Sequence, residues 1–347
     1  MKESFYSWNE YSFHFQKKAQ DVDISKNVVL GLLHYSKNLY DNNVPTIYDT
    51  KHLSYLTGYR ESYLLRIISR PQNFYRSFKI PKKNGHTREI TEPLPGLKSI
   101  QYWILNNIIA IIPPNKFNNA YTKGRSIVTN AKYHTKQSMI LNIDIEKYFD
   151  NIKHVAISAF FSNLGYNRDV SNALATLCTL NDGLPQGSPS SPYLSSLLTV
   201  DLDEKLFILS RNWGLRYSRY ADDITISGKF HPGTIIAGVR QILIESGFKI
   251  NESKTRVKKQ HQRQQVTGVV VNRKLSVKKK DLRDIRQSMY YIKTFGLEFH
   301  VEKIQLSKHN YIQHLLGKVN FYLFVKKGNQ ELILYKELLI SLLKAEE

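Results

Sequence analysis

The chain has 347 residues, 41% of them hydrophobic, which suffices for one large domain or for two to three small ones. Its net charge of +21 favours a polyanionic partner such as nucleic acid, with a basic protein lacking a specific partner as the alternative. The single cysteine, Cys178, excludes an internal disulfide and fits a reducing cytoplasm. With no signal peptide and no apolar run near about 18 residues, we expect a cytoplasmic protein without a membrane span.

The first third of the chain predicts helices followed by a hairpin. Residues 1–70 have helical spacing and many polar and aromatic side chains. Residues 78–95 change to short strands and turns, and the dipeptide Asn84-Gly85 is a strong hairpin signal. Residues 98–112 are then typical of a helix.

Two adjacent acids lie at the tip of a second predicted hairpin. The tetrapeptide Tyr-Ala-Asp-Asp at 220–223 separates an apparent strand over 215–220 from an alternating strand over 224–227. A third acid, Asp144, lies in an earlier strand whose odd positions over 139–145 are all apolar, so its side chain belongs to the opposite face. An Asp-Asp pair alone is more often a solvated turn, but the hairpin and the earlier acid favour a catalytic role.

Gathering three carboxylates requires compensation of their charge. Two carboxylates about 4 Å apart repel each other by roughly 4 kcal/mol at an effective dielectric of about 20. Mg²⁺ prefers carboxylate, water and substrate phosphate as ligands. The sequence therefore predicts two Mg²⁺ ions at Asp144, Asp222 and Asp223, an arrangement that suits phosphoryl transfer. If the acids only structure a turn, the chain is instead a non-catalytic basic RNA-binding scaffold.

A strongly basic segment follows, from Lys254 to Lys280, and it contains no acid. Phosphate contacts from such a segment give affinity for nucleic acid without sequence reading. A solvated charged face is the alternative for any short run of this kind. The candidate RNA- or primer-binding side chains here are Arg256, Lys258, Lys259, Arg263, Lys278, Lys279 and Lys280.

In their order along the chain, these motifs resemble a bacterial reverse transcriptase, specifically the retron type, over about residues 76–275. The boxes at 130–134 and 266–268 look specific to retrons. The motifs that carry the resemblance are the Lys/Arg hairpin at 79–88, Asn130-Ala-Lys-Tyr-His134, Asp144 with Phe149, Leu184-Pro-Gln-Gly187, Tyr220-Ala-Asp-Asp223, Gly247 with Asn251 and Lys254, and Val266-Thr-Gly268.

The resemblance implies an α+β, right-hand polymerase fold. Its expected parts are an N-terminal helical extension at 1–70, fingers at 71–135, an antiparallel-sheet palm at 136–275 and a helical thumb at 276–347. The implied enzyme is an RNA-directed DNA polymerase that uses dNTPs.

The retron resemblance also implies a dedicated partner. A structured noncoding RNA would serve as template and primer, with synthesis starting at a guanosine 2′-hydroxyl and yielding single-stranded DNA joined to RNA. Retron systems are linked to antiphage defence with an accessory effector protein. A group II-intron-like or other bacterial reverse transcriptase would need no particular RNA, and an RNA-dependent RNA polymerase should lack an aromatic residue at 149.

By resemblance, Asp144 and Asp222 are the main metal ligands and Asp223 is the lesser one. The backbone carbonyl of Ile145 would complete the shell of one metal ion.

Five further side chains are assigned to the nucleotide. By resemblance, Phe149 stacks under the incoming sugar and excludes a 2′-hydroxyl, and Gln186 contacts the sugar and the template base. Lys82 as a point charge and Arg88 as a bidentate fork suit the triphosphate. By resemblance, Lys254 approaches the leaving pyrophosphate, where it could donate a proton, and a contact with a backbone phosphate is the alternative.

The two retron-specific boxes are assigned to RNA and primer. Asn130 and His134 have the i, i+4 spacing of one helical face, and the resemblance implies recognition of a structured RNA. Val266, Thr267 and Gly268 would form a hairpin strand under the primer end, where glycine permits close approach of the backbone.

Overall fold

The chain folds into two compact units in the computed structural model, which describes residues 7–81, 85, 87–304 and 308–345. Unit 1 comprises residues 1–115 and 147–201, and unit 2 comprises residues 116–146 and 202–347. Both units combine helices with antiparallel strand ladders, so the predicted α+β class is confirmed. The division into extension, fingers, palm and thumb stays a prediction.

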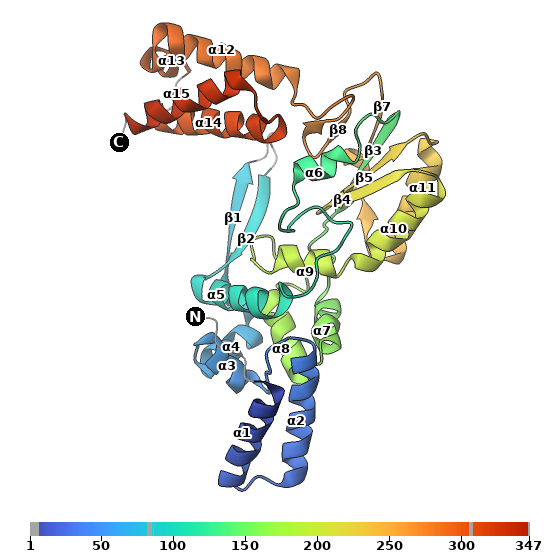
Figure 1. Cartoon of the computed structure of the whole chain (residues 1–347), viewed down its shortest axis with the longest axis vertical. Helices are drawn as coiled ribbons and strands as arrows, with labels where there is room; N and C mark the ends of the chain where they lie inside the picture. Colours follow the sequence, from blue (N-terminus) through green and yellow to red (C-terminus); the bar gives the residue numbers. More distant parts are fainter. Residues whose placement is uncertain (1–6, 82–84, 86, 305–307, 346–347) are drawn as a thin grey trace. The chain divides into compact units, whose positions relative to one another are not determined.

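The described part of the first 70 residues is helical, as the sequence predicts. A capping box between Ser7 and Glu10 begins the first helix, and Gly58 ends the third with a left-handed φ of 75°. Aromatic residues of the first helix pack on the second around Leu33, and Figure 1 shows these two helices side by side. The four helices are α1 (Trp8–Asp21), α2 (Lys26–Asp41), α3 (Thr50–Thr57) and α4 (Glu61–Ser69).

Unit 1 also contains the predicted first hairpin, formed by β1 (Tyr75–Pro81) and β2 (Thr87–Pro93). The buried Gln101 ties this hairpin to the helices, because its Nε2 donates to the Tyr75 hydroxyl at 2.9 Å and to the Leu177 carbonyl at 2.8 Å. The surrounding helices of unit 1 are α5 (Pro95–Ile104), a π-helical turn (Leu105–Ile109), α7 (His154–Asn163), α8 (Arg168–Cys178) and α9 (Ser191–Leu197).

Unit 2 is built on a five-stranded antiparallel sheet in the order β4-β5-β3-β6, with β7 also paired to β3. The predicted strand over 139–145 and the predicted hairpin around 220–223 both form. The strands are β3 (Met139–Glu146), β4 (Arg216–Tyr220), β5 (Asp223–Gly228), β6 (Lys249–Ile250) and β7 (Arg256–Lys259).

The two faces of this sheet differ in polarity. Because side chains alternate along a strand, the register places Ile143 of β3 beside Ile224 of β5 on one face. Arg219, which pairs with Ile224 and so shares its face, binds Asp203 of α10 (Val200–Asn212), and Figure 1 draws this helix and α11 (Pro232–Glu245) beside the sheet. The other face carries the polar residues of β3, β4 and β5 and is approached by α6 (Ile127–Lys132). The acids therefore lie on the face opposite Ile143 and Ile224.

A short hairpin links the sheet region to the C-terminal helices. It consists of β8 (Gln265–Val266) and β9 (Val269–Val270), joined by a turn in which Thr267 and Gly268 have φ of 45° and 84°. Two positive φ values match the type I′ turn, which favours glycine at its second position. The four helices that follow are α12 (Lys279–Phe295), α13 (Leu297–Ile304), α14 (Lys308–Val325) and α15 (Gln330–Lys344).

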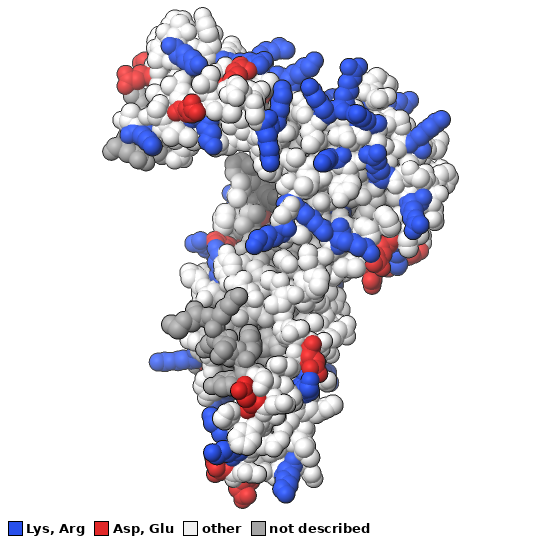
Figure 2. Space-filling view, in the orientation of Figure 1, with Lys and Arg blue, Asp and Glu red and all other residues white. Residues whose placement is uncertain are grey.

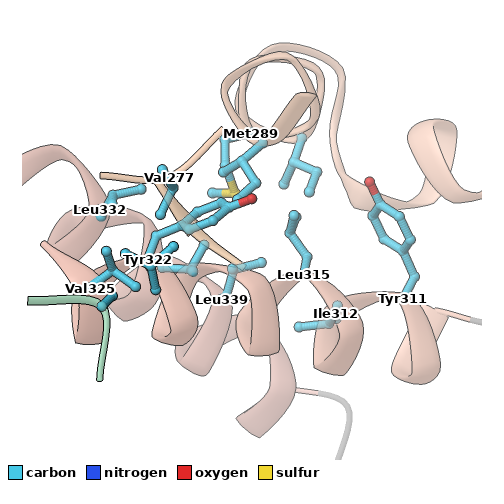
Figure 3. Close-up of a cluster of buried hydrophobic side chains, with 14 of the residues drawn as sticks. Val277, Met289, Tyr311, Ile312, Leu315, Tyr322, Val325, Leu332 and Leu339 are labelled. Atoms are coloured by element: carbon cyan, nitrogen blue, oxygen red, sulfur yellow. The ribbon is translucent and has the colours of Figure 1, made fainter. Parts of the chain in front are cut away.

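The hairpin valines and the C-terminal helices share one hydrophobic core. Met289 of α12, Leu315 and Tyr322 of α14 and Leu339 of α15 point toward one another in this core (Figure 3). Val266 of β8 belongs to the same cluster and is fully buried. None of the described helices is long and apolar enough to cross a membrane.

We predict that Leu339→Ala lowers the free energy of unfolding by about 2–5 kcal/mol, because it leaves a cavity in this core. Leu334 lies on the same helix with 57% of its surface exposed, so Leu334→Ala should change the free energy by less than about 0.5 kcal/mol. Urea denaturation of both variants measures the difference, and equal effects would show that the two positions are not packed as described.

Candidate active site

The strand register brings the three aspartates to one end of the unit 2 sheet. Asp144 of β3 lies directly opposite Asp223 of β5, so both side chains project from the same face. Asp222 lies in the turn before Asp223, and its backbone carbonyl accepts a hydrogen bond from the Ile145 N–H at 2.9 Å. Ile145 therefore lies at the same junction, while metal binding by its carbonyl stays a prediction.

The electrostatics of the three acids are those of a crowded anionic site. Asp223 is an exposed residue, yet partial desolvation of its carboxyl, together with repulsion from Asp222 and Asp144, raises its pKa to about 7. The positive charge of Lys254 acts to lower the pKa of the same carboxyl. A cation near these carboxylates would relieve their mutual repulsion.

Lys254 supplies such a cation in this structure. Its Nζ lies 2.8 Å from both carboxylate oxygens of Asp144, which is largely buried. Asn251 holds the same aspartate twice, since its Nδ2 donates to the carboxylate at 3.1 Å and its backbone N–H donates to the Asp144 carbonyl at 2.8 Å. The contact with Asp144 places Lys254 at the acids, while its role at the leaving pyrophosphate stays a prediction.

The residues present have the donor chemistry that a hard divalent cation needs. Within the described ranges 7–81, 85, 87–304 and 308–345, no three His, Cys, Asp or Glu side chains already form a metal-binding cluster. The donors here are carboxylates on adjoining strands, and Lys254 already forms an ion pair with one of them. Carboxylate oxygens of this kind suit Mg²⁺.

Unit 1 gathers the segments predicted to bind the nucleotide. The turn containing Gln186 lies against β2, because the Thr91 N–H donates to the Gln186 carbonyl at 3.1 Å. A Cβ on Gly187 would lie only 2.6 Å from the Thr91 carbonyl oxygen, so glycine is required there. On its other side the turn joins Phe149, whose carbonyl accepts from the Leu184 N–H at 3.1 Å.

These contacts place Phe149 and Gln186 beside the strand that carries Arg88. The Phe149 ring is partly exposed, unlike the adjacent Tyr148, whose buried hydroxyl donates to the Ser195 carbonyl at 2.9 Å. Arg88 lies on β2 opposite Ile80. The predicted triphosphate contact at Lys82 lies outside the described residues.

The box at 130–134 is internal, which corrects the prediction that its side chains contact RNA. Asn130 and His134 are almost completely buried. The Ser218 hydroxyl donates to the Asn130 carboxamide oxygen at 2.6 Å, and the His134 ring joins Ser218 at 2.8 Å and Ser227 at 2.7 Å. Ser218 and Ser227 belong to β4 and β5, so the box clamps the two strands of the acidic hairpin.

The Val-Thr-Gly box divides into buried and exposed parts. Val266 is a core residue with no surface for the primer, which corrects its predicted contact. Thr267 is partly buried and its hydroxyl donates to the Ile127 carbonyl at 3.4 Å. Gly268 is exposed, with open space where a side chain would lie. The turn can therefore face a ligand, whereas the strand before it cannot.

The basic segment lies along the edge of the unit 2 sheet and at the start of α12. Arg256, Lys258 and Lys259 lie on β7, which pairs with β3. Five of the seven predicted contacts are exposed, and Lys258 and Lys278 are half-buried. On the face shown in Figure 2, unit 2 displays more Lys and Arg than acidic side chains.

Three residues that contact the strands and the turn carrying the acids were not among the predicted site residues. Asn251 was part of the motif pattern, but nothing in the sequence indicated its bonds to Asp144. Arg219 and Asn118 both hydrogen-bond to the turn residue Ala221. An arginine directly before the Tyr-Ala-Asp-Asp motif was the available signal, because a charged side chain inside a predicted strand is unusual.

Comparison with known proteins shows consistent similarity. Residues 80–271 match the family described as reverse transcriptase (RNA-dependent DNA polymerase). The retron Ec86 reverse transcriptase of Escherichia coli is 32% identical over 278 residues, which is 78% of this chain and 83% of that protein. The retron Mx162 and Mx65 reverse transcriptases of Myxococcus xanthus are each 30% identical; the matches cover 57% and 64% of this chain, and 47% and 58% of those proteins.

His134 generates a prediction about acid stability. Burial, with a smaller effect of the Arg216 charge, lowers the pKa of its imidazole to about 3. Below pH about 6.5 the unfolded chain therefore binds a proton that the folded chain does not, and stability falls as the pH drops toward 3. Between about pH 7.5 and pH 5, the wild-type protein should lose about 2 kcal/mol more than His134→Gln.

Denaturant titrations at both pH values measure this difference. His261 is exposed and provides the matched control, since His261→Gln should lose stability with pH as the wild-type protein does. Equal losses in the wild-type protein and His134→Gln would show that His134 is not buried in its neutral form.

Proposed function

The chain belongs to the reverse transcriptase family and, within it, to the retron enzymes, and on this premise we propose that it copies one dedicated structured RNA into single-stranded DNA. It is an RNA-directed DNA polymerase, with RNA as template and DNA as product. The observation that carries the proposal is the register that sets Asp144 opposite Asp223, with Asp222 in the adjoining turn. We further propose that a guanosine 2′-hydroxyl of the same RNA is the primer.

The acids would organise the chemistry of nucleotide addition. Asp144 and Asp222, with Asp223 and the Ile145 carbonyl in support, would hold two Mg²⁺ ions, which when bound supply charge that activates the attacking hydroxyl and stabilises the leaving pyrophosphate. Asn251 keeps the Asp144 carboxylate oriented through the hydrogen bonds described above. Lys254 would contact the leaving pyrophosphate as negative charge develops on it and would donate a proton to it.

The nucleotide would be selected by residues of unit 1. The partly exposed ring of Phe149 would lie beneath the sugar and exclude a 2′-hydroxyl, which makes dNTPs the substrates. Gln186, fixed through its backbone to β2, would contact the sugar and the template base. Arg88 and Lys82 would bind the triphosphate, with the planar arginine fork forming the bidentate contact.

The basic surface would bind the template–primer duplex through its phosphates. An RNA–DNA hybrid is recognised by shape and backbone rather than by base edges, and such binding weakens steeply with salt. Arg256, Lys259 and Arg263 are exposed and positioned on or beside β7 for such contacts. We also propose that the enzyme acts in antiphage defence with an accessory effector protein, as the retron type implies.

The nucleic acid that copurifies with the protein tests this proposal. From cells that carry its native locus, the tagged full chain should copurify with one defined RNA joined to single-stranded DNA, as read by sequencing before and after ribonuclease treatment. The double variant Asp222→Asn/Asp223→Asn should retain the RNA but carry no DNA. Because the substitutions remove repelling charges, its melting temperature should equal or exceed that of the wild-type protein.

Each alternative gives a different outcome in the same experiment. A random pool of RNA would contradict the retron assignment while leaving a polymerase with general templates. Undiminished DNA in the double variant would contradict catalysis by these acids and leave an RNA-binding scaffold.

Phe149 provides a test of sugar selection. Phe149→Val should admit ribonucleotides, so the preference for dNTP over rNTP in primer extension should fall by at least about 10-fold. Tyr148→Phe is the matched control, because the Tyr148 hydroxyl is buried against Ser195 and its loss should leave the preference unchanged. An unchanged preference in Phe149→Val would remove the steric gate from the mechanism.

A further inference from the structure

The turn that carries Asp222 adopts an unfavourable backbone conformation. Tyr220 pairs with Asp223, so Ala221 and Asp222 alone form the turn of the hairpin. Ala221 has a φ of 58°, a left-handed conformation in which the alanine Cβ is crowded. Such a conformation persists only where the surroundings impose it.

Both backbone polar groups of Ala221 are held by side chains. Its N–H donates to Oδ1 of Asn118 at 3.2 Å, and its carbonyl accepts from Nη1 of Arg219 at 2.7 Å. Asn118 and Arg219 are both fully buried, and Ala221 is nearly so. These two buried side chains thus fix the orientation of the peptide units on both sides of Ala221.

Arg219 is itself anchored on the helix-covered face of the sheet. Its Nε donates to the Asp203 carboxylate of α10 at 2.7 Å, and its Nη2 contacts the second oxygen of the same carboxylate. The Tyr217 hydroxyl also donates to Asp203. Because the guanidinium is a rigid planar fork, the contacts of Nε and Nη2 determine where Nη1 points. Asp203 of α10 therefore fixes the Arg219 guanidinium, which in turn fixes the direction of the Ala221 carbonyl.

Asn118 is anchored by its own backbone. The segment around it runs beside β4, where the Arg219 N–H donates to the Phe117 carbonyl at 3.2 Å and the Asn119 N–H donates to the Arg219 carbonyl at 2.8 Å. Arg125 donates to the Asn118 carbonyl at 2.8 Å. The carboxamide that binds Ala221 therefore projects from a fixed main chain.

We propose that Asn118 and Arg219 are positioning residues that set the direction of the Asp222 and Asp223 carboxylates by clamping the peptide units of Ala221. The proposal rests on the metal-binding role proposed above for these acids. Asp203 acts through Arg219, whereas Tyr217 contributes to packing and to the burial of Asp203 but makes no described hydrogen bond to the turn. Loss of the clamp should weaken metal binding and slow catalysis with little effect on nucleotide binding by unit 1.

Two variants remove the clamp in independent ways. Asn118→Ala deletes the acceptor for the Ala221 N–H. The triple variant Tyr217→Phe/Asp203→Leu/Arg219→Met deletes the donor to the Ala221 carbonyl and replaces the buried ion pair with apolar groups, an exchange that proteins often tolerate. Tyr217→Phe alone is the matched control, because it perturbs the same buried cluster without touching the turn.

Titration of each purified full-length protein with Tb³⁺, followed by sensitised luminescence, measures metal affinity without catalysis. Both clamp variants should bind Tb³⁺ about 10- to 100-fold more weakly than the wild-type protein and the control. In primer extension their kcat should fall by a similar factor, while KM for dNTP changes less than about 2-fold. Melting temperatures, measured in parallel, identify any variant that fails to fold.

The outcomes separate this proposal from the proposed function. If either folded clamp variant binds Tb³⁺ and turns over like Tyr217→Phe, then Asn118 and Arg219 only stabilise the fold and the proposal is wrong. If the wild-type protein binds Tb³⁺ but synthesises no DNA on any RNA template, the proposed function fails while the affinity comparison still tests the clamp. A wild-type protein that binds no Tb³⁺ overturns both.

Discussion

Repulsion between carboxylates on adjoining strands is the constraint around which unit 2 is organised. The ladder between β3 and β5 sets Asp144 against Asp223, and no small adjustment of the side chains can separate residues that are directly paired. The fold compensates with one ammonium group, from Lys254, and with the amide of Asn251. Neither compensating residue lies on the acidic strands, so both can yield to a stronger cation without breaking the ladder.

Rigidity of the acidic hairpin is supplied from outside the site. The His134 ring joins β4 to β5 on the polar face, and Arg219 joins β4 to α10 on the apolar face. Both groups are buried and polar, and such groups are costly unless they are fully paired. Both groups lie beside the strands that carry the acids, so they fix the geometry of the acidic hairpin.

The sequence predicted those features that depend on local pattern. Alternation over 139–145 and the tetrapeptide at 220–223 predicted two strands and a turn, and the order of motifs predicted the family. The spacing of Asn130 and His134 indicated that they act together, and they do meet at Ser218. The resemblance implied RNA recognition for these two residues, and local spacing could not correct it, because spacing does not distinguish a face turned to solvent from one turned inward.

The contacts that the sequence did not predict join residues that lie far apart along the chain. Arg219 forms an ion pair with Asp203 on a helix, and its backbone pairs with that of Asn118 on a distant loop, whose side chain binds Ala221. No periodicity along the chain links these positions. Val266 resembles any strand valine, and only its packing on helices at the end of the chain shows that it is core.

The shared core of the β8–β9 hairpin and the C-terminal helices bears on how this polymerase can be dissected. Val266, Val269 and Val271 lose their apolar neighbours if the chain is cut before α12. A truncated catalytic fragment would expose this strip to water and tend to aggregate. Exchange of C-terminal helices between relatives would have to include the hairpin, because the hairpin valines and the helices fill the same core.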